Sequence, residues 1–268
     1  MSEYTAAADE SAGPDGRGWF HYGGFVAPSR DWDGAFSTAW RERVLGGARP
    51  IPHLHMTDMR SRTWRERQGL RQWEADQKVE EAVRILNSTG SLYPLAVQLD
   101  AGHFAEAFEG IKVKNPALPE VAPFYFEPDY FCFILFAMGV LHAVSLRDPT
   151  CSRVHFLVER KNRVHARLTH FHSQMAAGVT ALGAPGLAPL VGKLIPGGKA
   201  DLPLQAADLL CWYTQRVSHG RLSRVEERHF WSLARRKGMF VPITREEVAD
   251  FAARARAAGG LPRDSRTT

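Results

Sequence analysis

The feature that most constrains the fold is the long apolar run Tyr130–Leu146 (YFCFILFAMGVLHAVSL). Its length is close to the lower limit for a membrane-spanning helix. However, the run carries His142, and Glu127 and Asp129 lie just before it. We therefore expect a helix that is buried on most sides within the protein and is ended by Asp148-Pro149.

A second apolar segment, Arg153–Val158 (RVHFLV), is nearly continuous in apolar and β-branched residues, which is typical of a central strand. The order of strands and helices along the chain predicts an α/β domain with a mixed β-sheet flanked by helices and a helical C-terminal extension. The other expected strands are Tyr4–Ala8 and Gly18–Ala27, as an antiparallel hairpin, Leu92–Leu99 and Leu190–Ile195. The other expected helices are Asp31–Leu45, Arg60–Leu86, Val164–Met175, Leu204–His219, Val225–Lys237 and Thr244–Ala258. The proline-containing segment His103–Asp129 is expected to be a connection with one helical turn.

Composition excludes several classes of protein. The chain has 268 residues, 7 Trp, 15 Phe and a net charge of +5, so a folded core is expected and a nucleic-acid partner is allowed but not required. Its three widely spaced cysteines argue against a disulfide framework or a cysteine zinc site. We expect a main domain over residues 1–220, a helical extension over 221–258 packed on it, and a disordered tail over 259–268. The first residues carry no secretory signal, so a cytoplasmic protein is expected.

Three acidic residues lie at the ends of predicted elements or within an apolar helix. Asp9 follows the first strand, Glu159 follows the central strand, and Asp208 lies in the run LQAADLL. Carboxylates that converge from strand ends and a helix can bind Mg²⁺ or Mn²⁺, which prefer oxygen ligands. Each residue also has a purely structural interpretation: a turn former, a solvated strand exit and a buried hydrogen-bond acceptor, respectively.

Further polar residues accompany these carboxylates. Those expected to support the site from a second layer are Glu10, Ser11, His55, Asp58 and Gln205. His55 or Asp58 could also act as a general base. Arg160, Lys161 and Arg163 directly follow Glu159 and could position a phosphate, and arginines with tryptophans cluster along the expected Arg60–Leu86 helix. A polar loop and ordinary solvated surfaces are the alternatives.

The motifs resemble a known bacterial family. Asp9-Glu10-Ser11, followed by a turn and a strand with Gly23-Gly24-Phe25-Val26, is similar to the opening of the family called domain of unknown function 3800. Gly198-Lys199 and Leu204–Leu210 resemble its closing motif. The resemblance covers residues 4–216 and implies a ribonuclease-H-like fold with Asp9, Glu159 and Asp208 as metal-binding catalytic carboxylates. Ala12 and Glu159 depart from the Gly and Asp that are common there.

The resemblance implies a nuclease that hydrolyses phosphodiester bonds of DNA or RNA with Mg²⁺ or Mn²⁺. The alternative is a catalytically inactive ribonuclease-H-like module that binds nucleic acid or protein in a defence or mobile-element system. A third hypothesis is a structural protein with a buried polar triad. No membrane partner is expected, and the sequence leaves the oligomeric state open.

Overall fold

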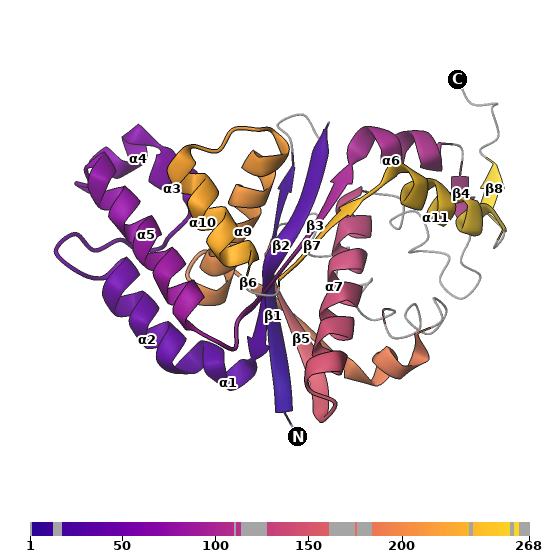
Figure 1. The fold of residues 1–268 in the computed structure, drawn as a ribbon, viewed down its shortest axis with the longest axis horizontal. Helices are drawn as coiled ribbons and strands as arrows, with labels where there is room; N and C mark the ends of the chain where they lie inside the picture. Colours follow the sequence, from indigo (N-terminus) through magenta and orange to yellow (C-terminus); the bar gives the residue numbers. More distant parts are fainter. Residues whose placement is uncertain are drawn as a thin grey trace.

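A computed structural model describes residues 2–12, 18–109, 111–113, 128–160, 175, 184–235, 238–257 and 260–262. Its centre is a six-stranded mixed sheet with the strand order β6-β5-β1-β2-β3-β7 (Figure 1). The strands are β1 (Ser2–Ala12), β2 (Trp19–Pro28), β3 (Tyr93–Asp100), β5 (Cys151–Glu159), β6 (Val191–Gly197) and β7 (Met239–Ile243). Within this sheet the pairings are parallel except those of β2 with β1 and β3, so β2 alone of these six strands runs in the opposite direction. The predicted α/β fold with a mixed sheet is confirmed.

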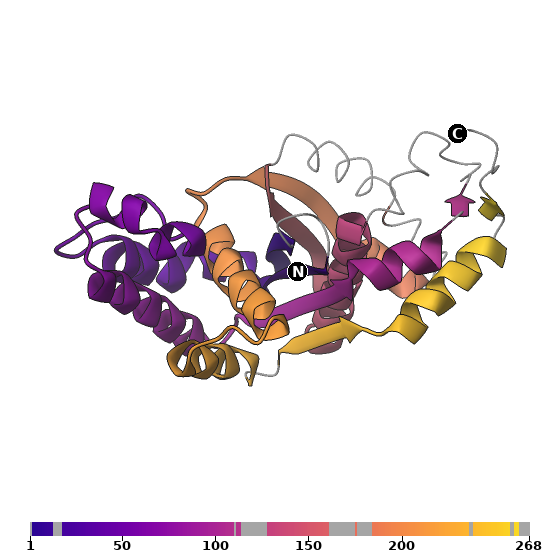
Figure 2. The ribbon, with the colours of Figure 1, turned by 90° about the horizontal axis from the view of Figure 1, so that it is seen from above.

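Helices cover both faces of the sheet (Figures 1 and 2). One face packs against α7 (Pro128–Arg147), α6 (Ala101–Phe108) and α11 (Arg245–Ala257). The other face packs against α5 (Gln72–Ser88), α9 (Leu202–Ser218) and α10 (Arg224–Ala234). The strands alternate between these layers: Ala6 and Ala8 belong to the α7 core, whereas Ala7 belongs to the α9 core.

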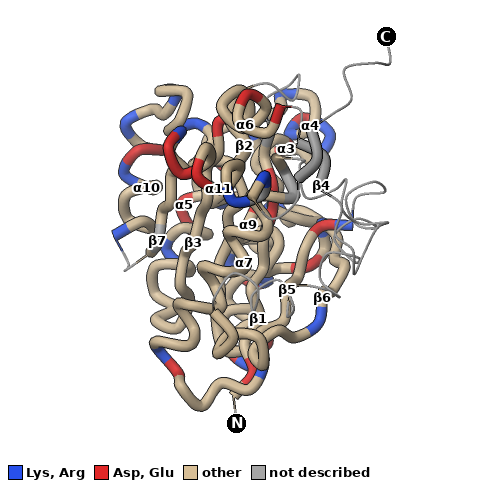
Figure 3. Tube along the Cα trace, turned by 90° about the vertical axis from the view of Figure 1, so that its right-hand side faces the viewer, with Lys and Arg blue, Asp and Glu red and all other residues tan. Residues whose placement is uncertain are grey.

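Helix α7 is the buried helix predicted from the apolar run. Phe133, Phe136, Val140 and Leu141 are fully buried in it. In Figure 3, the tube along α7 is almost entirely tan, the colour of uncharged residues. Among the described residues, no helix has both the length and the apolar character needed to cross a membrane.

The predicted helix Arg60–Leu86 is wrong as a single element. The chain forms α3 (Met56–Arg60), α4 (Arg62–Arg67) and α5 instead. Ser61 adopts an extended backbone and its hydroxyl accepts a hydrogen bond from the Trp64 N–H, so it begins α4 rather than continuing α3. Gly69 has φ +66°, a left-handed conformation that suits glycine and separates α4 from α5.

The remaining N-terminal segments are close to expectation. The Asp31–Leu45 region is helical, with α1 (Ser29–Asp31) and α2 (Ser37–Ala39) separated and followed by wider π-type turns. Helix α6 and the short strand β4 (Ile111–Val113) occupy part of the predicted connection. A 3₁₀ turn (Pro185–Leu190) precedes β6. The predicted helix Val164–Met175 lies outside the described residues except for Met175.

The sequence predicted a helical C-terminal extension, but the extension also contains a strand. Strand β7 adds to the main sheet in parallel with β3, from Leu95↔Met239 to Leu99↔Ile243. Helix α11 follows, and its predicted capping box is confirmed: the Thr244 N–H donates to Glu247, and the Glu247 N–H donates to Thr244 Oγ1. Within the expected tail, β8 (Gly260–Pro262) pairs with β4.

Candidate functional site

Three predicted carboxylates, those of Asp9, Glu159 and Asp208, line one small pocket of about 20 Å³ on the α9 side of the sheet. The register of β1 and β5 pairs Ala8 with Val158, so the next residue of each strand, Asp9 or Glu159, lies level with the other. Both share the strand face of Ala7 and Leu157, which belongs to the α9 core. Helix α9 contributes Asp208 from above this face. The sheet register and one helix therefore bring together residues from three distant parts of the chain.

The prediction that Asp9 ends the first strand is wrong, because β1 continues to Ala12 and pairs with β2 over its whole second half. The other neighbour of β1 in the sheet, strand β5, ends at Glu159. Beyond Ala8, the edge of β1 that faced β5 is no longer covered by that strand. This is where the pocket lies.

Two glycines in β2 allow the close packing around the site. A Cβ atom on Gly24 would lie 1.8 Å from the Ala7 carbonyl oxygen, so no side chain fits there. A Cβ atom on Gly23, which pairs with Asp9, would already be in contact with the Cys211 backbone of α9 at 3.5 Å. Gly24 thus permits the close approach of β1 and β2, and α9 packs in direct contact with β2 at Gly23, beside Asp9.

Asp208 is shielded from water but has two polar neighbours. Its side chain is 15% exposed, its Oδ2 accepts a hydrogen bond from the Met56 N–H at 2.7 Å, and its Oδ1 lies 3.6 Å from His55 Nε2. Burial raises the pKa of Asp208, and the nearby negative charge of Glu159 raises it further. The charges of His55 and Lys199 and the Met56 hydrogen bond offset this only in part. A carboxylate in this position is stabilised by additional positive charge.

His55 connects Asp208 to a second carboxylate, Asp58. The Nδ1 atom of His55 lies 3.1 Å from Asp58 Oδ2, on the opposite side of the ring from Asp208. The same Asp58 oxygen lies 3.0 Å from His53 Nε2 and accepts a hydrogen bond from Lys199 Nζ at 3.1 Å. Burial alone would raise the pKa of Asp58, but the hydrogen bonds from His53 and Lys199 and the charge of His55 lower it below its usual value. Asp58 therefore stays ionised and fixes the ring of His55.

Gln205, three residues before Asp208, is buried, and both polar atoms of its side chain form hydrogen bonds that hold neighbouring segments in place. Its Oε1 accepts hydrogen bonds from Trp40 Nε1 at 2.8 Å and from the Leu54 N–H at 3.1 Å. Its Nε2 donates to the Lys199 carbonyl oxygen at 2.9 Å. Gln205 thus joins α9 to the segment that carries His55 and to the turn after β6, as expected of a supporting residue.

Other predicted site residues lie elsewhere. Glu10 is adjacent to Asp9 but points to the α7 face, where it accepts a hydrogen bond from the Tyr22 hydroxyl at 3.3 Å. Ser11 lies on β1 opposite His21 and does not line the pocket. Arg160 is exposed, also outside the pocket, and its N–H donates to the Gly197 carbonyl oxygen. Neither Glu10 nor Ser11 lines the pocket, and their supporting roles stay a prediction. Lys161 and Arg163 lie outside the described residues.

Sequence reasoning missed two groups at the site. Lys199 lines the pocket from the turn after β6, and the Met56 N–H, the first of α3, holds Asp208. Lys199 could have been found, since its turn follows the strand that pairs with β5, and β5 ends in Glu159. The Met56 N–H leaves no trace in the sequence, because any residue type has this group.

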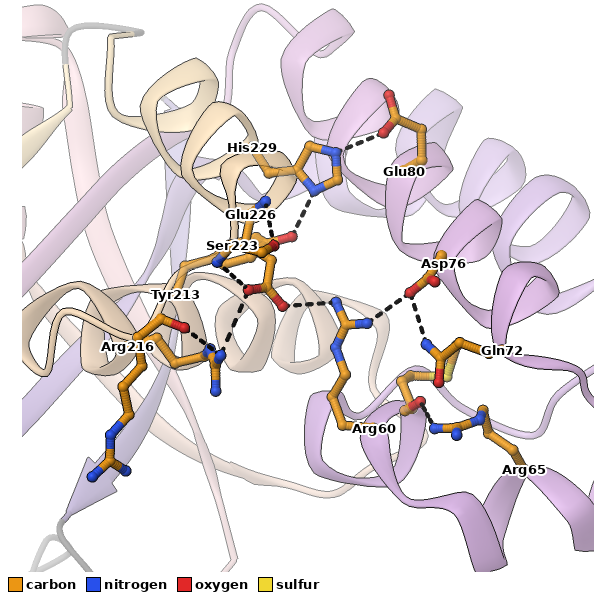
Figure 4. A network of polar contacts seen from close by, with 12 residues as sticks. Arg60, Arg65, Gln72, Asp76, Glu80, Tyr213, Arg216, Ser223, Glu226 and His229 are labelled. Atoms are coloured by element: carbon orange, nitrogen blue, oxygen red, sulfur yellow. Dashed lines mark hydrogen bonds and ion pairs between the residues drawn. The ribbon is translucent and has the colours of Figure 1, made fainter.

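A network of polar and charged residues holds the last residue of α3 in place (Figure 4). Arg60, the last residue of α3, lies 2.6 Å from Asp76 on α5 and 3.1 Å from Glu226 on α10. Beside it, His229 bridges the Tyr213 hydroxyl at 2.8 Å and Glu80 at 2.6 Å. These contacts join α3, α5, α9 and α10 and so fix the helix whose first N–H contacts Asp208.

The donor set of the pocket can be compared with the needs of a metal ion. Carboxylate oxygens suit Mg²⁺ and Mn²⁺, and the repulsion between Glu159 and Asp208 is of the kind that a cation relieves. Yet in the described part of the chain, no three His, Cys, Asp or Glu side chains are already gathered closely enough to hold an ion. Binding would require the carboxylate side chains to turn toward a common point. Comparisons with protein-family models, curated proteins and solved structures found no match for the chain.

Proposed function

We propose that the protein is a metal-dependent nuclease that hydrolyses phosphodiester bonds of DNA or RNA. The observation that carries this proposal is the meeting of Asp9, Glu159 and Asp208 in one pocket, from two strands and a helix. His55 and Lys199 also line the pocket, and their charges offset the repulsion between the carboxylates only in part. Glu159 still raises the pKa of Asp208. Such perturbed groups in a concave site are typical of functional sites.

The three carboxylates are the residues that would hold Mg²⁺ or Mn²⁺. The bound ion would supply Lewis acidity and a more acidic water molecule. The pocket of about 20 Å³ has room for roughly one water-sized particle, which favours one ion over two in this conformation.

His55 is the residue best placed to accept a proton. With the Asp58 carboxylate against Nδ1, the ring in its neutral form would carry its proton on Nδ1, so that Nε2, 3.6 Å from Asp208 Oδ1, would be able to accept another. An attacking water could pass its proton to Nε2, and Asp58 would stabilise the imidazolium. Lys199 Nζ, which also lines the pocket, can contact a phosphate oxygen.

The resemblance to domain of unknown function 3800 supports the same proposal. A mixed sheet flanked by helices is the architecture that a ribonuclease-H-like assignment implied. The basic segment Arg160–Arg163 follows Glu159 directly in the sequence, which suits a polyanionic substrate. We infer that the protein works in the cytoplasm, on nucleic acid.

The test is a cleavage assay on single- and double-stranded DNA and RNA with Mg²⁺ or Mn²⁺. The wild-type protein should cut at least one substrate, EDTA should stop it, and Asp208→Asn should lower the rate by at least about 100-fold. Asp250→Asn is the matched control: it makes the same change on α11, where Asp250 is exposed and ion-paired with Arg254. Intact substrates in every condition, or an Asp208→Asn variant as active as the control, would contradict the proposal.

A catalytically inactive nucleic-acid-binding module is the second candidate. It is favoured by the lack, among the described residues, of a ready-made cluster of metal ligands. In that case the protein would bind nucleic acid equally well with EDTA and with Mn²⁺, without cutting it. Calorimetric titration with Mn²⁺ separates the two, because only the nuclease should bind the ion and lose it in Asp208→Asn.

A further inference from the structure

A second cavity lies at the end of the sheet where β1 begins, away from Asp9, and is lined by residues from the α7 side together with Leu92 and Arg235. Its volume is about 660 Å³, within the range of roughly 300–1,000 Å³ typical of small-molecule sites. It is bounded by the first half of β1, the end of β2, the turn that enters β3 and the last turn of α7. The lining residues are Tyr4, Val26, Pro28, Gly90, Ser91, Leu92, Tyr93, Ala143, Val144, Arg147 and Arg235. Nothing in the proposed nuclease reaction uses this cavity.

The charge of the cavity is one-sided. Two of its described lining residues, Arg147 and Arg235, are basic, and none of them is acidic. Within the described part of the chain, neither guanidinium is paired with a carboxylate. The hollow between α5 and α10 is different, because its Arg60 is paired with both Asp76 and Glu226. An uncompensated pair of guanidinium groups favours an anionic occupant.

Arg147 is held in a defined position. The guanidinium carbon of Arg147 lies 3.4 Å from the centroid of the Tyr93 ring, so the planar group is stacked on the aromatic face. The neighbouring Asp148 does not line the cavity, and its carboxylate accepts hydrogen bonds from the hydroxyl groups of Ser2, Thr150 and Tyr4. A stacked guanidinium keeps its edge N–H groups available for the oxygens of a carboxylate or phosphate.

The floor of the cavity is apolar. Leu92, Val26 and Val144 are buried there, and the rings of Tyr4 and Tyr93 form part of its wall. A few oriented polar groups above apolar and aromatic walls are the usual composition of a ligand site. The geometry points to a binding site for a small molecule that has a flat apolar body and one anionic head, a phosphate or a carboxylate. This inference does not depend on the proposed nuclease activity.

Calorimetric titration of the full chain tests this inference. The probes are adenosine 5′-monophosphate and indole-3-acetate, which share a flat body but differ in the head, together with adenosine, which lacks an anion, and inorganic phosphate, which lacks a body. At least one of the two aromatic anions should bind with a Kd below 1 mM, and adenosine and phosphate should bind at least tenfold more weakly. The first two probes distinguish a phosphate from a carboxylate as the natural head.

Two variants locate the binding. Arg147→Ala and Arg235→Ala should each weaken it at least tenfold, and Arg235→Ala leaves the stack of Arg147 on Tyr93 in place as a check on folding. The matched control is Arg30→Ala, two residues beyond Pro28, whose guanidinium is exposed and lies 3.6 Å from Asp31. The same titrations are repeated with the Asp208→Asn variant in EDTA. Binding that persists there does not occur at the carboxylate pocket. A Kd above 1 mM for both aromatic anions, or binding that survives both arginine substitutions, would overturn the inference.

Discussion

At the scale of single residues, the buried negative charge of Asp208 lowers the stability of the folded protein. Burial and the charge of Glu159 both raise the pKa of Asp208. A carboxyl group whose pKa is higher in the folded state than in the unfolded state makes folding less favourable as pH rises through that interval. The same burial and repulsion between carboxylates favour the binding of a cation in the pocket.

The first prediction follows for Asp208→Asn. The amide still accepts the hydrogen bond from the Met56 N–H but carries no charge, so the variant should unfold at a higher Tm than the wild type at pH 7. Thermal unfolding at pH 4 and pH 7 measures this, and the difference should shrink at pH 4. Asp250→Asn should leave Tm unchanged. A less stable Asp208→Asn protein would show that the carboxylate is a structural acceptor instead.

A second residue, His21, predicts acid sensitivity. It is buried in β2, lies 2.8 Å from the Ser218 hydroxyl through Nε2, and burial lowers its pKa to about 4. Because the unfolded chain binds this proton more tightly than the folded chain, stability should fall as pH drops from about 6.5 to 4, by up to about 3 kcal/mol from this group. Urea unfolding of His21→Gln should show a flatter pH dependence over that interval. An unchanged slope would contradict the prediction.

Residue types at the site were predictable where they are chemically distinctive. Asp9, Glu159, Asp208, His55 and Gln205 all line the pocket. The separation of Asp9 from Glu10 followed from the period of a strand, which sends neighbours to opposite faces. The use of the Met56 N–H and the grouping of His53 and Lys199 on Asp58 depend on long-range packing, which local patterns do not encode.

At the scale of elements, the close approach of β1, β2 and α9 decides whether the carboxylates meet. Gly24→Ala would place a methyl group 1.8 Å from the Ala7 carbonyl oxygen. Since that contact is with backbone, the strands must separate, and we expect a loss of about 3 kcal/mol in the free energy of unfolding. Urea denaturation measures it. Gly186→Ala, where an added Cβ atom meets nothing within 4 Å, is the control; equal effects of the two substitutions would contradict the argument.

Element boundaries were harder to predict than element types. The helix expected over Arg60–Leu86 fails at Ser61 and Gly69, where one residue caps a new helix and the other takes a positive φ. Both residue types are tolerated within helices, so a periodic pattern alone does not reveal the breaks. Strand β7 was missed because its five residues include Pro242 and its neighbours are strong helix formers.

At the scale of the whole molecule, the last part of the chain belongs to the main fold. Strand β7 covers β3, α10 buries Phe230 and Leu233, and α11 buries Val248 and Ala252. Burial of large side chains contributes about 1.5–3 kcal/mol each, and a domain is stable by only about 5–15 kcal/mol.

Removal of residues 221–268 should therefore abolish cooperative thermal unfolding, measured by circular dichroism and calorimetry. The full-length control is Trp231→Gln, which changes an exposed residue of α10 and should unfold as the wild type does. A truncated chain with a sharp transition would instead show that residues 1–220 fold independently of the extension.

The sheet order has a consequence for biosynthesis. The meander β1-β2-β3 is complete once about the first hundred residues have been made, whereas the next neighbour of β1 is β5, which pairs Ser2 with Cys151. While the ribosome adds the intervening segment, β1 presents an open hydrogen-bonding edge that another nascent chain could occupy. Translation speed between the codons of Asp100 and Cys151, and the chaperones that meet the chain there, should therefore govern the yield of folded protein.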